Sequence, residues 1–202
     1  MSKGIYCLEG FWEPRITTRS SVEPTLQMLQ QNEKTKYFYH RCGTREEFEF
    51  FIKKWTQKGY QKKYPILYLA FHGVEEGLRI NSSLVYKIDD LAQILEGKCE
   101  RTLIFFASCK TLDSHKSVFT RFNKTTNALA VLGFRKEVDW YLSTAFELLV
   151  LQELSSDSFN FDSRGIIEFS QSVKENYAKL DRELEFRLIE NPYWFSRKQK
   201  VA

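Results

Sequence analysis

Five short runs rich in Val, Ile, Phe and Tyr alternate along the chain with segments of helical hydrophobic spacing. The last three runs are apolar at nearly every position, which is typical of parallel strands that are covered on both faces. The predicted strands cover residues 3–8, 36–40, 64–71, 102–107 and 128–134.

Between and after these strands, apolar residues recur at steps of three and four, which predicts helices. Thr44 and Glu47 have the spacing of a capping box at the start of one of them. The expected helices cover residues 22–31, 46–57, 89–95, 113–122, 138–154 and 165–188, the last as one long charged helix, either continuous or interrupted. This alternation predicts an α/β fold with three layers, α/β/α, around a mainly parallel central sheet.

The composition and charge indicate the general class of protein. Of its 202 residues, 43% are hydrophobic and 28% charged, which excludes a disordered chain and allows an ordinary core. The net charge is only +4 and opposite charges are mixed, so we interpret the basic stretches 53–63 and 196–200 as solvated surface and expect no nucleic-acid partner. Apolar runs are far shorter than the roughly 18 residues of a membrane span, and residues 1–10 lack the pattern of a signal peptide. We expect a cytoplasmic protein with no membrane partner.

Several common sites are excluded by missing motifs. There is no glycine-rich dinucleotide or P-loop pattern and no G-x-S-x-G nucleophile motif. The histidines are too scattered, and the cysteines too far from C-x-x-C spacing, to suggest a metal site. We therefore expect free thiols, no metal and no cofactor. These residues are His40, His72, His115, Cys7, Cys42, Cys99 and Cys109.

Two pairs of residues follow consecutive predicted strands at equivalent places, His72-Gly73 and Ser108-Cys109. Ligands bind at the carboxyl ends of the strands in open parallel sheets, so an imidazole and a thiol are expected at one sheet edge. A nearby imidazole supplies a base or an ion-pair partner that raises the thiolate fraction. The backbone N–H groups of Gly73 and Cys109 are candidates for an oxyanion hole.

A non-catalytic interpretation stays open for each residue. Cysteine at the end of an apolar strand is commonly a small buried hydrophobe, and a single histidine after a strand commonly makes structural hydrogen bonds. It is their matched placement that favours chemistry. His40 ends the second predicted strand, and His115 lies six residues after Cys109 on a predicted helix. We interpret both as incidental, and they serve as controls.

The segments ILYLAFHG, GLRINSSLVYKIDDLAQIL and RTLIFFASCKT resemble the core of caspase-like (clan CD) cysteine peptidases, closest to the CHAT branch, which includes relatives of separase. In that branch the nucleophile motif reads Ser-Ala-Cys-x-Thr, whereas residues 107–111 here read ASCKT, with the two small residues exchanged. The segment NALAVLGFRKEVDWYLSTAFELLVLQEL also resembles the strand and helix that follow. We expect one caspase-like domain over residues 1–202, with a motif-bearing core at 65–154 and a helical extension at 163–202.

This resemblance implies a cysteine endopeptidase that acts on a protein substrate, with Cys109 as nucleophile and His72 as general base and acid. Family members are commonly fused to sensor or repeat domains, and we expect none here. An isolated catalytic domain of this kind is expected either to be controlled by a regulatory protein partner or to have lost its activity. In the related enzymes, an acidic residue in the first pocket selects basic side chains, whereas basic residues select aspartate. The candidate pocket residues are Asp113, Asp139 and Ser108, although either aspartate could instead cap a helix. Other acidic candidates are Glu75 and Glu76, and the basic ones are Lys110, Arg79 and Arg135.

Two alternative functions depend on other features of the sequence. A catalytically silent interaction or signalling module is suggested by the many aromatic residues and by the Tyr193-Trp194-Phe195 cluster. A small-molecule or nucleotide-binding module of receiver-like topology lacks the clustered acids or glycine-rich loop that would support it.

Overall fold

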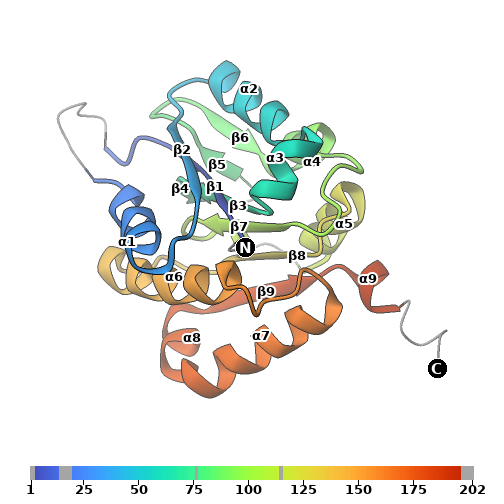
Figure 1. The fold of residues 1–202 in the computed structure, drawn as a ribbon. Coiled ribbons are helices and arrows are strands. Elements are labelled where there is room, and N and C mark those ends of the chain that lie inside the picture. The colour runs from blue at the N-terminus through green and yellow to red at the C-terminus, as the bar shows by residue number, and fades with distance from the viewer. Residues whose placement is uncertain (1–2, 14–19, 76, 114–115, 197–202) are drawn as a thin grey trace.

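A six-stranded sheet crosses the middle of the molecule, with helices on both of its faces (Figure 1). The computed structural model describes residues 3–13, 20–75, 77–113 and 116–196. The strand order is β2-β1-β3-β7-β8-β9, and every neighbouring pair is parallel except β8 with β9. The strands are β1 (Ile5–Glu9), β2 (Tyr37–Arg41), β3 (Ile66–Ala70), β7 (Leu103–Ala107), β8 (Ala130–Phe134) and β9 (Phe186–Glu190).

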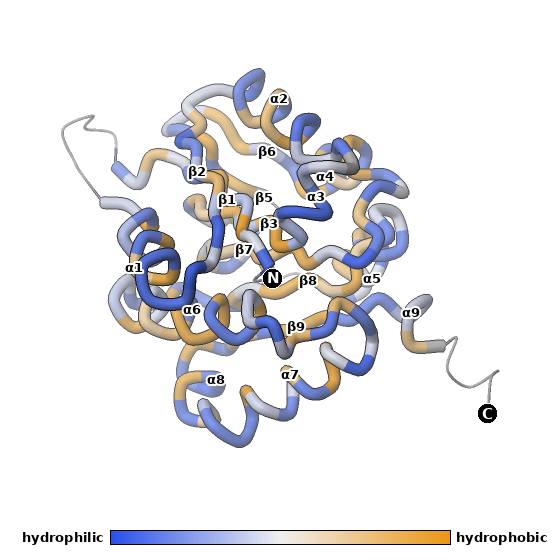
Figure 2. Tube along the Cα trace, in the orientation of Figure 1, coloured by the Kyte–Doolittle hydropathy of each residue, from blue (hydrophilic) through white to orange (hydrophobic). Residues whose placement is uncertain are grey.

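Each face of the sheet has its own buried core. Tyr6 and Leu8 of β1 point into one core, while Ile5 and Cys7 point into the other, because side chains alternate across a strand. Figure 2 shows the hydrophobic positions gathered on the strands and on the inner sides of the helices. The first core is covered by α2 (Arg45–Trp55), α4 (Ile88–Ile94) and α5 (Lys116–Thr126), and the second by α1 (Glu23–Glu33), α6 (Trp140–Ser155) and α7 (Ser163–Asn176).

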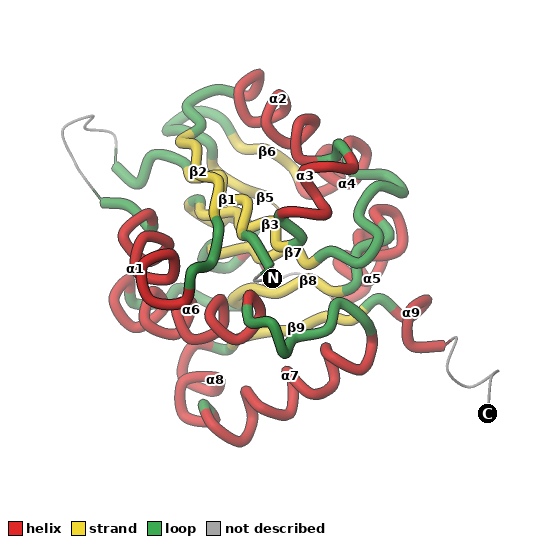
Figure 3. The backbone as a smooth tube through the Cα atoms, viewed as in Figure 1, coloured by secondary structure: helices red, strands yellow, loops and turns green. Residues whose placement is uncertain are grey.

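A second, antiparallel sheet of three short strands follows directly on β3 (Figure 3). Its strands are β4 (His72–Val74), β5 (Gly77–Arg79) and β6 (Val85–Lys87). Since β4 begins at His72, this small sheet fixes the direction in which the chain leaves the end of β3.

The predicted fold class and all five predicted strands are confirmed. The capping box is present as well, with the Thr44 hydroxyl accepting a hydrogen bond from the backbone of Glu47. The helix expected at 46–57 is followed by an additional short helix, α3 (Lys58–Lys63). A 3₁₀ turn over Thr111–Asp113 replaces the start of the helix expected at 113–122.

The long helix expected at 165–188 is interrupted, and its last residues are not helical. The chain forms α7, then α8 (Ala178–Leu184), and then turns at Glu185, whose φ of 47° ends the helix. β9 follows and pairs antiparallel with β8, and α9 (Pro192–Ser196) comes after it. The exposed edge of β8 offers a row of backbone hydrogen bonds that this segment satisfies only as a strand. The extension expected at 163–202 is therefore not wholly helical, and its residues 197–202 lie outside the described part.

Strand order also indicates where a sheet of this kind would bind a ligand. From β1 the chain crosses to β2 on one side, whereas from β3 it crosses to β7 and β8 on the other. In open parallel sheets, ligands bind outside the carboxyl ends of the strands where the order reverses in this way. That place lies between the ends of β1 and β3. Within the described residues, no helix has the length and hydropathy needed to cross a membrane.

Candidate active site

His72 and Cys109 follow the carboxyl ends of two neighbouring strands, β3 and β7, at equivalent positions. Ala70 lies opposite Ala107 in the parallel pairing of β3 with β7, and each of the two residues follows two positions later. Both side chains line one cavity of about 170 Å³. The structure thus brings together the imidazole and the thiol that the strand ends predict.

The orientation of the His72 ring is set by residues beyond the end of β1. Its Nε2 is hydrogen-bonded to the backbone carbonyl oxygen of Trp12, and the two rings lie edge to face with centroids 5.2 Å apart. A carbonyl oxygen only accepts, so Nε2 carries the proton. In the neutral ring, Nδ1 is then the free acceptor.

Cys109 lies in a tight turn after β7. The turn is closed by Lys110, which has a φ of 60° and donates its backbone N–H to the carbonyl of Lys136, at 3.2 Å. The preceding Ser108 is buried, and its hydroxyl lies 2.7 Å from that of Thr111. Cys109 itself is only partly buried.

Gly73 is in direct backbone contact with this turn. A Cβ atom at position 73 would lie 1.6 Å from the carbonyl oxygen of Cys109 and 2.6 Å from the Thr111 hydroxyl. Only glycine permits the loops after β3 and β7 to approach so closely. The oxyanion role of the Gly73 and Cys109 N–H groups stays a prediction.

The Cys109 thiol is not pre-ionised. Burial is the largest influence and raises its pKa, and the nearby carboxyls of Glu147 and Glu137 raise it further, while a backbone hydrogen bond from Val138 lowers it. Burial therefore disfavours ionisation of this thiol, and an effect of the imidazole on the thiolate fraction stays a prediction. The thiol is protonated at neutral pH, since an ordinary cysteine already is.

Trp12 and His72 line two cavities. The 170 Å³ cavity that they share with Cys109 is otherwise lined by Val22, Ala107, Ser108, Phe134, Val138, Trp140, Ser143, Thr144 and Glu147. A wider cavity of about 580 Å³ is otherwise lined by Phe11, Glu13, Gly43, Gly73, Arg79, Asn81 and Ser82. His72 is therefore in contact with two spaces that could receive parts of a ligand.

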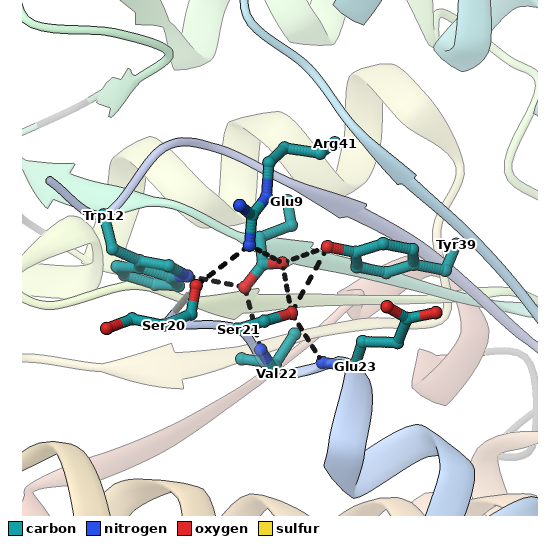
Figure 4. A network of polar contacts seen from close by, with 8 residues as sticks. All are labelled: Glu9, Trp12, Ser20, Ser21, Val22, Glu23, Tyr39 and Arg41. Atoms are coloured by element: carbon teal, nitrogen blue, oxygen red, sulfur yellow. Dashed lines mark hydrogen bonds and ion pairs between the residues drawn. The ribbon is translucent and has the colours of Figure 1, made fainter. Parts of the chain in front are cut away.

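Sequence reasoning missed Glu9, the last residue of β1. Its carboxylate is fully buried and accepts hydrogen bonds from the side chains of Trp12, Ser21, Tyr39 and Arg41 and from the backbone of Val22. Figure 4 shows this carboxylate at the centre of the network. The bond from Trp12 Nε1, at 2.5 Å, holds in place the residue whose carbonyl orients His72. A charged residue ending an otherwise apolar strand was the available signal.

Glu147 of α6 was missed as well. It is buried, lines the cavity beside Cys109, and accepts a 2.5 Å hydrogen bond from Tyr68 of β3. Burial raises the pKa of this carboxyl to about 8, an effect that the Tyr68 hydroxyl opposes only in part. Glu147 lies on the buried stripe of α6 with Ser143 and Val150, and an acid on an apolar stripe is a signal visible in the sequence.

Of the predicted pocket residues, only Ser108 lines the cavity. The Asp139 carboxylate caps α6 by accepting the backbone N–H of Leu142, at 2.9 Å. Asp113 is exposed, 3.9 Å from Arg135. Neither aspartate is among the residues that line either cavity at His72.

The other histidines and cysteines are not among the residues that line the cavity at Cys109, or they lie outside the described residues. His40 packs its ring on Phe51, with centroids 3.8 Å apart, and His115 is outside the described part. All four cysteines are free thiols, as expected, and Cys7, Cys42 and Cys99 are fully buried. The described residues contain no group of three His, Cys, Asp or Glu that could hold a metal ion.

The chain matches one family model and is similar to solved structures. A model of a family of unknown function, DUF6642, matches residues 2–190. The crystal structure of caspase-1 from Spodoptera frugiperda is similar with a TM-score of 0.50 and 15% identity, over 83% of this chain and 75% of that one. The structure of pro-sf-caspase-1 is similar with a TM-score of 0.50 and 14% identity, over 88% of this chain and 83% of that one. No curated protein matches the chain. At such identities the likeness shows a caspase-like fold.

Proposed function

The chain belongs to the DUF6642 family, whose function is unknown, and we propose that it is a cysteine endopeptidase with Cys109 as nucleophile and His72 as general base. One observation supports this most: His72 Nε2 is hydrogen-bonded to the Trp12 carbonyl, while the same ring lines a cavity with the Cys109 thiol. Nδ1, the acceptor of the neutral ring, thus belongs to a residue that shares a cavity with a partly exposed thiol.

The reaction begins with a proton transfer. His72 Nδ1 takes the proton of the Cys109 thiol as the sulfur attacks the carbonyl carbon of the scissile peptide bond. The Trp12 carbonyl stabilises the imidazolium that forms, because it accepts a hydrogen bond from Nε2–H. The oxyanion develops on the substrate oxygen, for which we propose the Gly73 and Cys109 N–H groups as donors.

His72 then returns its proton to the leaving amine, and the peptide bond breaks to leave a thioester on Cys109. A water molecule gives a proton to His72 and attacks the thioester carbon. This step releases the carboxylic acid and restores the thiol. Because the thiol starts protonated, His72 acts as a true general base and not as the partner in a preformed ion pair.

The experiment is cleavage of a proteome-derived peptide library, with new termini identified by mass spectrometry. Wild type is compared with Cys109→Ala and His72→Ala, and with His40→Ala as a control histidine outside the site. We expect cleavage to be lost in the first two variants and kept in the third, with all melting temperatures close to wild type. Cleavage that survives Cys109→Ala or His72→Ala in a folded protein excludes this mechanism.

We further assign the chain to the CHAT branch of these peptidases, on the motif at residues 107–111 and the His72-Gly73 pair. Thr111 supports this, since its hydroxyl contacts Ser108 and donates to the carbonyl of Gly77. The motif thereby ties the nucleophile turn to the small sheet that carries His72.

A catalytically silent module is the second candidate, favoured by the raised pKa of the resting thiol. The aromatic cluster Tyr193-Trp194-Phe195 gives this candidate little support. Trp194 and Phe195 pack against the core, and of the three rings only that of Tyr193 is exposed. Intact folding with no cleavage of any library peptide would favour this candidate.

A further inference from the structure

Two buried carboxyl groups lie close to the candidate site, and their surroundings differ. Glu9 accepts five hydrogen bonds, one of them from the guanidinium of Arg41. Glu147 accepts one, from the neutral hydroxyl of Tyr68. Among the described residues, no cationic group pairs with Glu147. A buried acid is ordinarily paired or neutral, so this carboxyl has the capacity to accept a cation from outside the chain.

The space beside Glu147 has the size and walls for such a cation. The cavity of about 170 Å³ compares with the roughly 150 Å³ that admits a benzene molecule. It has room for a side chain of about six non-hydrogen atoms. Its aromatic walls include Trp12, Trp140 and Phe134, and indole faces attract cations.

Cys109 and Glu147 line the same cavity. A substrate whose scissile carbonyl lies at the Cys109 sulfur can place a neighbouring side chain into this space. The residue that reaches it from the acyl side is the one immediately before the scissile bond.

We infer that this cavity is the specificity pocket of the enzyme and that Glu147 selects a basic side chain, lysine or arginine, at the residue before the scissile bond. The inference builds on the proposed function, because it assigns a substrate class to that same site. It replaces Asp113 and Asp139 as pocket acids by a residue that lines the cavity.

Proton release from Glu147 distinguishes the binding of a cationic side chain from that of a neutral one. With a pKa of about 8, Glu147 is mostly neutral at pH 7, and an incoming cation favours its ionised form. Binding at pH 7 then releases up to one proton. The titratable groups that face this carboxyl are Tyr68, Cys7, Cys109 and His72, and a cation at Glu147 repels a protonated His72.

The test measures binding apart from chemistry. Nα-acetyl-lysine methylamide and its norleucine analogue are titrated calorimetrically into the Cys109→Ala protein at pH 7, in two buffers of different ionisation enthalpy. We expect the lysine compound to bind roughly 10- to 100-fold more tightly, as for a charge-assisted hydrogen bond, with proton release. Glu147→Gln should abolish both the preference and the proton release. Glu153→Gln, a matched change on the same helix outside the cavity, should leave both unchanged.

Glutamine reproduces the neutral carboxyl in size and can still accept from Tyr68, so the Glu147→Gln protein is expected to fold. Equal binding of the lysine and norleucine compounds, or binding of neither, overturns the inference. So does a preference for lysine that survives Glu147→Gln.

A second arm separates this inference from the proposed function. Acetyl-lysyl and acetyl-norleucyl chloromethyl ketones are reacted with wild type and His72→Ala, and modification of Cys109 is followed by mass spectrometry. Labelling that depends on His72 but not on the side chain overturns the pocket assignment and supports the dyad. Lysine-selective binding without His72-dependent labelling supports the pocket and contradicts the peptidase mechanism.

Discussion

At the scale of single residues, the chemistry depends on where each polar group finds its partners. Glu9 is saturated with donors, and one of them, Trp12, carries the carbonyl that orients His72. Glu147 has a single donor and is left with a raised pKa. The same residue type thus acts as a structural anchor in one place and remains available to a ligand in the other.

Glu147→Gln should change the pH dependence of stability. The unfolded carboxyl loses its proton near pH 4.5, whereas the folded one keeps it until about pH 8. The free energy of unfolding of the wild type therefore falls as pH rises between these values. We expect the variant to gain about 4 kcal/mol relative to wild type between pH 4.5 and pH 8.

Urea denaturation at both pH values measures this difference. Glu153 is only partly buried, so Glu153→Gln should show a smaller change. A Glu147→Gln protein with the same pH dependence as wild type would show that the carboxyl is ionised in the folded state at neutral pH.

At the scale of elements, the site is made by two loops in contact and by the helix that follows. Gly73 at the start of β4 meets the backbone of Cys109 after β7. The segment after β8 then supplies Val138, which bonds to the Cys109 sulfur, and Asp139, which caps α6. Each loop is short, so its position follows from the strand before it.

Gly73→Ala should destabilise the protein by about 2 kcal/mol or more and abolish any activity, because its methyl group would overlap the Cys109 carbonyl. Gly59 is the matched control. It lies in α3, and a methyl group added there would have no atom of another part of the chain within 4 Å. Gly59→Ala should stabilise by about 0.5–1 kcal/mol through helix propensity. Thermal melting compares the two; equal effects would contradict the close contact at Gly73.

Asp139→Ala should cost about 1 kcal/mol, the usual effect of losing a helix cap. Substrate preference should not change, since Asp139 is not among the cavity-lining residues. Melting and library cleavage together check this. An altered preference with unchanged stability would instead support Asp139 as a pocket residue.

At the scale of the whole molecule, the three layers decide which side chains reach solvent. Cys7 lies on the central sheet, and Cys42 and Cys99 are enclosed in the opposite core. Cys109 follows the carboxyl end of a strand and stays partly exposed. The architecture itself singles out one thiol of four.

Limiting iodoacetamide should therefore alkylate Cys109 well before the other three cysteines in the native state. The rate should still be rising at pH 9, because burial raises the pKa of this thiol. Mass spectrometry of each cysteine from pH 5 to pH 10 measures the profile. A rate already maximal at pH 6, or faster reaction of Cys7, would contradict the structure.

Much of the fold was predictable because its information is local. Apolar runs mark the five parallel strands, and Thr44 with Glu47 marks a helix start. β9 was not predictable, since its strand conformation depends on pairing with β8, more than fifty residues earlier. The tertiary hydrogen bonds outweigh a helical pattern that a single segment carries.

By itself, the sequence determined the layered α/β fold and the positions of His72 and Cys109 just after two consecutive strands, because both follow from hydrophobic periodicity. Only the tertiary structure decided that Trp12 orients His72, sixty positions away, and that Glu147 lies beside Cys109 and bonds to Tyr68. These contacts join residues that no local pattern connects, and burial, which decides how a carboxyl titrates, exists only once the layers have packed.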